Sequence, residues 1–77
     1  MKTILDIAIE DATALAKQSV AVRAKMEEED TVRDHFIRKR YRNLYRALIL
    51  RTRGRTPSTR ECDLSLEEAK EAADGGR

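Results

Sequence analysis

The chain has 77 residues and a single cysteine, Cys62, so it holds at most one domain and no internal disulfide. The only histidine, His35, matches no zinc-ligand spacing with Cys62, and no apolar run is long enough to span a membrane. Because no apolar core stands before the charge at Asp6, we expect no secretory signal. The formal net charge of +2 conceals three blocks of about −3, +9 and −4 over residues 1–30, 31–60 and 61–77. We therefore expect one small cytoplasmic domain without metal or cofactor. Because so short a chain has little core, we expect it to be a homo-oligomer, most simply a dimer.

Residues 4–27 are the first predicted helix, because apolar and small side chains recur there at alternating spacings of three and four. These heptad positions are Leu5, Ala8, Ala12, Leu15, Ser19, Val22 and Met26. Asp6 lies near the start, where a carboxylate suits the positive end of the helix dipole. A short strand over residues 4–9 is the competing interpretation.

A turn is predicted at residues 27–31, because consecutive glutamates oppose the dipole at the C-terminal end of a helix. One continuous helix over about 4–53 also fits the sequence. The second predicted helix covers about 31–53 and carries the apolar stripe Ile37, Tyr41, Leu44 and Leu48. Gly54 is the expected C′ residue of this helix. The two helices predict an antiparallel hairpin.

Residues 54–64 are predicted to be a loop, with Cys62 as an incidental thiol within it. Ser65-Leu66-Glu67-Glu68 is a capping box, so a short third helix is expected over about 65–73, followed by a frayed tail at 74–77. The predicted fold is therefore all-α, and two copies are expected to form a four-helix bundle. The residues expected at the oligomer interface are Leu5, Ala8, Ala12, Leu15, Val22, Ile37, Tyr41, Leu44 and Leu48.

The basic block carries the main functional signal. Residues 31–60 contain nine arginines, one lysine and a single carboxylate, Asp34. The predicted binding residues lie on one side of the second helix, roughly opposite its apolar stripe, and are Arg38, Lys39, Arg42, Arg46 and Arg53. Like charges one turn apart repel unless an anion relieves them. That anion is a nucleic acid, an acidic protein or one of the chain's own acidic flanks.

Two further arginines, Arg40 and Arg51, border the apolar stripe, and their charged ends are expected to snorkel or to pair across the helix interface. In an antiparallel hairpin with its turn at residues 28–29, Arg51 is level with Asp6 and Arg46 is level with Asp11. We therefore expect Arg51 to form a structural ion pair across the helix interface.

The sequence contains no phosphate-binding glycine loop and no arrangement of nucleophile and base, so we expect a non-catalytic binding protein. The favoured hypothesis is a regulatory protein whose basic helix contacts the phosphate backbone of a nucleic acid, with RNA slightly favoured over DNA. The alternative is a protein-interaction factor, such as an adaptor, assembly factor or inhibitor, that docks its basic helix on an acidic protein. No membrane partner is expected.

Overall fold

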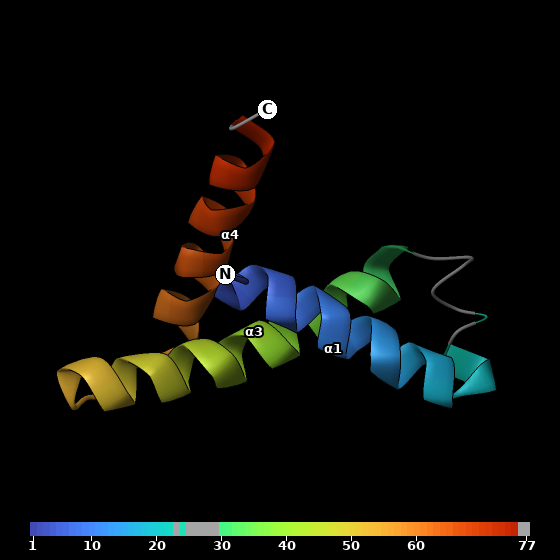
Figure 1. Ribbon diagram of the computed structural model, residues 1–77, viewed down its shortest axis with the longest axis horizontal. Coiled ribbons are helices and arrows are strands. Elements are labelled where there is room, and N and C mark those ends of the chain that lie inside the picture. The colour runs from blue at the N-terminus through green and yellow to red at the C-terminus, as the bar shows by residue number, and fades with distance from the viewer. Residues whose placement is uncertain (23, 25–29, 76–77) are drawn as a thin grey trace.

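The computed structural model describes residues 1–22, 24 and 30–75. These residues form an all-helical fold in which α1 (Ile4–Gln18) packs against α3 (Asp30–Arg53), while α4 (Thr59–Gly75) packs mainly on α3. Figure 1 shows α1 and α3 side by side with opposite chain directions, and α4 rising steeply from both. The predicted all-α class is confirmed. Met26 and residues 27–29 of the predicted turn lie outside the described residues, as do residues 76 and 77, so the hairpin connection stays a prediction. Residues 30 and 31, predicted to belong to the turn, are already helical.

α1 begins at Ile4, as predicted, because Thr3 caps it. The Asp6 N–H donates to Thr3 Oγ1 at 3.1 Å, and the Thr3 N–H donates to Asp6 Oδ2 at 3.1 Å. This reciprocal pair satisfies two backbone donors that a helix start would otherwise leave unpaired. The bond from the Thr3 backbone also holds the pKa of the Asp6 carboxyl below its ordinary value. The competing strand over residues 4–9 is wrong.

The first helix is shorter than the predicted 4–27. α1 ends at Gln18, Ser19 is not helical, and helical geometry resumes at residues 20–22. The Ser19 hydroxyl accepts a hydrogen bond from the Val22 N–H at 3.3 Å. A serine side chain that bonds nearby backbone competes with the helical pattern, which accounts for the interruption. The same interruption contradicts a single continuous helix over residues 4–53.

α3 confirms the second predicted helix, and its end depends on a glycine. Gly54 has a φ of 71°, and its N–H donates to the Leu50 carbonyl at 3.0 Å. Glycine adopts this left-handed conformation without the steric cost that a Cβ brings. The helix therefore stops where the sequence predicted, and the chain turns back toward α4.

α4 begins at Thr59 rather than at Ser65, so the predicted loop over 54–64 is wrong in its second half. Ser58 caps the helix, since its Oγ accepts from the Glu61 N–H at 3.2 Å and its carbonyl accepts from the Cys62 N–H at 3.1 Å. The sequence holds two Ser-x-x-Glu capping boxes, and the structure uses the earlier one. α4 also continues through Gly75, beyond the predicted end at residue 73.

The core lies where α1, α3 and α4 meet. Ala8 and Ala12 are 0% and 1% exposed, and such small side chains let α1 approach α3 closely. Tyr41 is buried, its hydroxyl bonds to Ser65 Oγ at 2.8 Å, and burial raises its pKa. The buried cluster consists of Leu5, Ala8, Ala12, Ile37, Tyr41 and Leu66. Five residues expected at an oligomer interface (Leu5, Ala8, Ala12, Ile37 and Tyr41) are thus covered within one chain.

Candidate functional site

Two of the five predicted binding residues, Arg38 and Arg42, face the acidic helix α4. Arg42 Nε and Nη2 donate to the two carboxylate oxygens of Asp63 at 2.8 and 3.0 Å. Arg38 Nη2 pairs with the Glu67 carboxylate. The two arginines are one helical turn apart on α3, and the two carboxylates are one turn apart on α4. The ladder of guanidinium groups therefore matches a ladder of carboxylates.

A third carboxylate, Asp34, completes this ionic cluster from the basic helix itself. Asp34 Oδ2 accepts from Arg38 Nε at 2.8 Å, and Asp34 Oδ1 accepts from Lys70 Nζ at 2.7 Å. The bond from Lys70, followed by that from Arg38, holds the pKa of the Asp34 carboxyl below its ordinary value. We call this set the α3/α4 ionic cluster; its members are Asp34, Arg38, Arg42, Asp63, Glu67 and Lys70. Three cations and three carboxylates balance in it.

Arg46 secures the segment that leads into α4. Its Nη2 donates to Thr59 Oγ1 at 2.7 Å and its Nε donates to the Pro57 carbonyl at 3.3 Å. The predicted position of Arg46 beside Asp11 is therefore wrong. Arg46 acts within the fold, as a support for the start of α4, rather than as a free cation.

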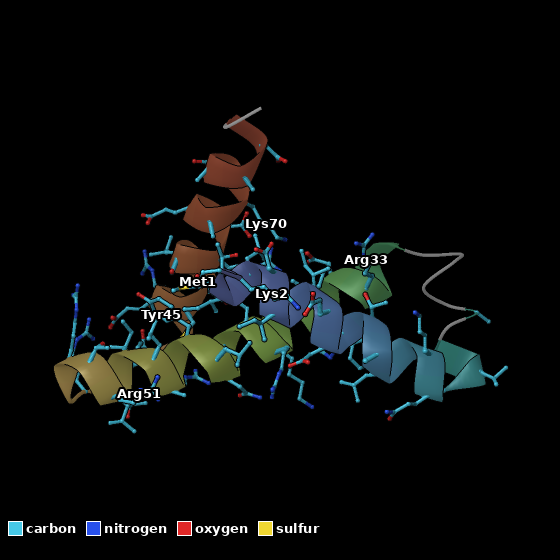
Figure 2. All side chains as sticks on the ribbon, viewed as in Figure 1. Met1, Lys2, Arg33, Tyr45, Arg51 and Lys70 are labelled. Carbon is cyan, nitrogen blue, oxygen red and sulfur yellow. The ribbon has the colours of Figure 1, made fainter. Side chains whose placement is uncertain are left out.

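Asp11 instead pairs with Arg40, whose Nε lies 2.6 Å from Asp11 Oδ2. Arg40 replaces Arg46 opposite Asp11, a shift of six residues along α3 (46 − 40). The predicted register assumed an unbroken first helix up to residue 27, and the interruption at Ser19 removes that basis. The predicted pairing of Arg51 with Asp6 is also wrong, because the Asp6 carboxylate instead accepts a hydrogen bond from the Thr3 backbone N–H. Figure 2 shows Arg51 on the side of α3 that faces away from α4.

The two remaining predicted binding residues, Lys39 and Arg53, are exposed on α3. Within the described part of the chain, neither forms an ion pair. Helical spacing puts both on the side of α3 that carries Asn43 and Leu50, and Leu50 is 53% exposed. We call this surface the outer edge of α3, defined by Lys39, Asn43, Leu50 and Arg53.

The described residues show no cluster of three or more side chains suited to hold a metal ion. None of the helices seen in residues 1–22, 24 and 30–75 has both the length and the apolar character that a bilayer crossing requires.

Cys62, expected in a polar loop, is instead buried in α4 with 0% exposure. Its thiol is thus part of the packing between helices.

Sequence reasoning missed the residues that occupy the basic face. Asp63, Glu67 and Lys70 recur at spacings of four and three, which is the pattern of one helix face, but the loop predicted over 54–64 concealed it. A continuous helix from Ser58 would have revealed a charged face able to meet Arg38 and Arg42. Comparison of the chain with family models, with curated proteins and with solved structures found no match.

Proposed function

We propose that this chain is a small non-catalytic protein-interaction factor that docks the outer edge of α3 on an acidic protein surface. The observation that supports it most is the α3/α4 ionic cluster, in which arginines of the basic helix α3 pair with carboxylates of α4. The basic helix thus already binds one acidic helix within the chain. Because Arg38 and Arg42 are neutralised there, a partner meets mainly Lys39, Leu50 and Arg53. In this proposal α1 and α3 form an antiparallel hairpin, and two copies associate as a four-helix bundle.

The exposed leucine favours a protein partner over a nucleic-acid backbone. Leu50 is 53% exposed and lies between Lys39 and Arg53 along the helix. A phosphate backbone offers no apolar contact for such a side chain, whereas a protein surface does. Lys39 and Arg53 are separated by about 21 Å along the helix axis at 1.5 Å per residue, a length that suits a protein–protein contact patch.

Nucleic-acid binding is the second candidate, since Lys39 and Arg53 are exposed cations that could reach phosphates. The five predicted contacts would give a slope of log K against log salt of roughly −4.5, at about −0.9 per phosphate. Arg38 and Arg42 are in ion pairs, and Arg46 is bonded to the Pro57 carbonyl and to Thr59. Only Lys39 and Arg53 of the five then remain as phosphate contacts, and the expected slope becomes roughly −2. Such binding would be weak and independent of sequence. RNA stays slightly favoured over DNA in this second candidate.

The two candidates are separated by affinity capture at moderate salt, with and without nuclease. The test variant is Lys39→Glu/Arg53→Glu. Its matched control is Lys17→Glu/Arg60→Glu, which changes the net charge equally at exposed sites on α1 and α4. We expect captured acidic proteins to survive nuclease, to be lost with the test variant and to be retained with the control.

Capture that disappears with nuclease would favour the nucleic-acid candidate, and a high ratio of absorbance at 260 to 280 nm in the purified protein would agree with it. Equal loss in the test variant and the control would mean that only net charge matters. Either result would overturn docking through the outer edge of α3.

A further inference from the structure

α1 carries a second seam beside the one that is buried in the core. Its members recur at spacings of three, four, three and four, and are Ile4, Ile7, Asp11, Ala14 and Gln18. On α3, a neighbouring series recurs at spacings of four, three and four, and consists of Arg40, Leu44, Ala47 and Arg51. Regular spacings of three and four are typical of helix faces that pack on other helices. Together we call these nine residues the outer α1/α3 face.

Two grooves show that this face is open. One is lined by Ile4, Ile7, Leu44, Ala47, Leu48 and Arg51. The other is lined by Asp11, Ala14, Leu15, Gln18 and Arg40. Leu15, which borders the second groove, is 49% exposed. Arg51 lies on the side of α3 away from α4, so α4 does not cover this end of the face (Figure 2).

Two of the three charged residues of the face, Asp11 and Arg40, are paired with each other. Asp11 and Arg40 form an ion pair between the two helices, and their side chains are 39% and 42% exposed. The bond uses Arg40 Nε and Asp11 Oδ2. Among the described residues, the Nη groups of Arg40 and the second oxygen of Asp11 stay open to further bonds. The pair lines the second groove at its end nearest the first, because Asp11 separates Ile4 and Ile7 from Ala14 along α1.

We propose that a second copy of this chain packs on the outer α1/α3 face, with a two-fold axis close to the Asp11–Arg40 pair. Such an axis sets the groove with bulky Ile4 and Ile7 of one copy against the groove with Ala14 and Leu15 of the other. Ile4 and Ile7 of one copy then meet the small Ala14 of the other, as close packing between helices requires. The face is self-complementary in size, which is what a two-fold dimer needs.

Charge complementarity also selects a second copy as the occupant. The two-fold axis brings the ion pairs of both copies together, so that the open Nη groups of each Arg40 reach the open oxygen of the other Asp11. The four charges of the two pairs sum to zero, and each of them has a partner in the interface. Arg51, the third charged residue of the face, lies at the opposite end of the α3 series from Arg40 and therefore away from the axis. The resulting four-helix arrangement uses residues that the fold leaves exposed or only partly buried, instead of Leu5, Ala8 and Ala12, which are buried within one chain. It is independent of the partner proposed for the outer edge of α3.

The test is the oligomeric state of the full chain, measured by sedimentation and by light scattering over a range of concentrations. Ala14→Glu and Ala47→Glu place a carboxylate on the face at exposed helix positions, where a single chain tolerates it. Ala72→Glu is the matched control, an exposed alanine on α4. We expect a dimer for the unmodified chain and for the control, and at least roughly tenfold weaker association for the two test variants, because each added carboxylate must lose its water when the interface forms.

Charge reversal gives the second readout. Asp11→Arg should weaken the dimer, and Asp11→Arg/Arg40→Asp should restore it, because the double variant recreates every pair with opposite polarity. Helical content by circular dichroism shows that each variant is folded. A monomeric unmodified chain would overturn the proposal, as would a dimer that Ala72→Glu disrupts while Ala14→Glu and Ala47→Glu leave it intact.

Discussion

The docking of α4 should depend on its apolar anchor more than on the ionic cluster. Leu66 is 0% exposed, and replacing a buried leucine by alanine costs about 2–5 kcal/mol. The side chains of Arg42 and Asp63 are 31% and 32% exposed, and those of Arg38 and Glu67 are 30% and 52% exposed. Pairs that meet so much solvent contribute about 0–1 kcal/mol each. Leu66→Ala should therefore release α4 far more than Asp63→Asn/Glu67→Gln does.

Cys62 provides the assay, since it is the only cysteine and its 0% exposure shields the thiol while α4 is docked. The rate of labelling by a thiol reagent under native conditions reports how often α4 opens. A loss of about 2 kcal/mol or more should speed the labelling of Leu66→Ala by roughly 30-fold or more. In the Asp63→Asn/Glu67→Gln variant, the labelling rate of Cys62 should rise roughly fivefold, which corresponds to about 1 kcal/mol.

Leu64→Ala is the control for Leu66→Ala, because Leu64 lies on the same helix but is 56% exposed. Its labelling rate should match that of the unmodified chain. Added salt should also change the rate only slightly, since it screens the ion pairs and leaves the apolar contact intact. If Asp63→Asn/Glu67→Gln, or salt alone, accelerates labelling as much as Leu66→Ala does, the apolar anchor is not the main contact that holds α4.

The remaining predictions concern pH, a hydrogen bond and a turn. Hydrogen bonds from cations lower the pKa of the Asp34 and Asp63 carboxyls, so their contribution to stability is present above about pH 4, the unfolded-chain value, and is lost as pH falls through the folded-state pKa. Urea unfolding of Asp34→Asn/Asp63→Asn should therefore depend less on pH in this acid range. Tyr41→Phe should cost about 1 kcal/mol in the same assay, because the Ser65 hydroxyl loses its partner. Gly54→Ala should lower the thermal midpoint by an amount equivalent to about 1 kcal/mol, since its φ is 71° and space is not limiting; no change would contradict this reading of the turn.

The sequence was sufficient for features that local chemistry decides. The start at Ile4, the extent of α3 and the stop at Gly54 follow from capping residues, an uninterrupted apolar stripe and a glycine that tolerates a left-handed conformation. These signals depend only on neighbours along the chain.

What tertiary packing decides could not be predicted. Ser58 and Ser65 each begin a Ser-x-x-Glu motif, and only the burial of Cys62 and Leu66 against the other helices selects the earlier start. Ser65 then bonds to Tyr41 instead of capping a helix. The position of the acidic face of α4 follows from that choice. The basic stripe could therefore be recognised from the sequence, but its neutralisation could not.

The buried alanines of α1 have a consequence for how this fold tolerates change over evolution. Ala8 and Ala12 leave almost no exposed area, so an added methylene group at either position must push α1 away from α3, at a cost of about 1–3 kcal/mol. The opposing residues of α3, such as Ile37, fill space and can be exchanged for others of similar volume. Divergent versions of this chain should thus keep small residues at positions 8 and 12 while they vary the bulk on α3. Substitution on α1 is limited by distance between helices, and substitution on α3 is limited by volume.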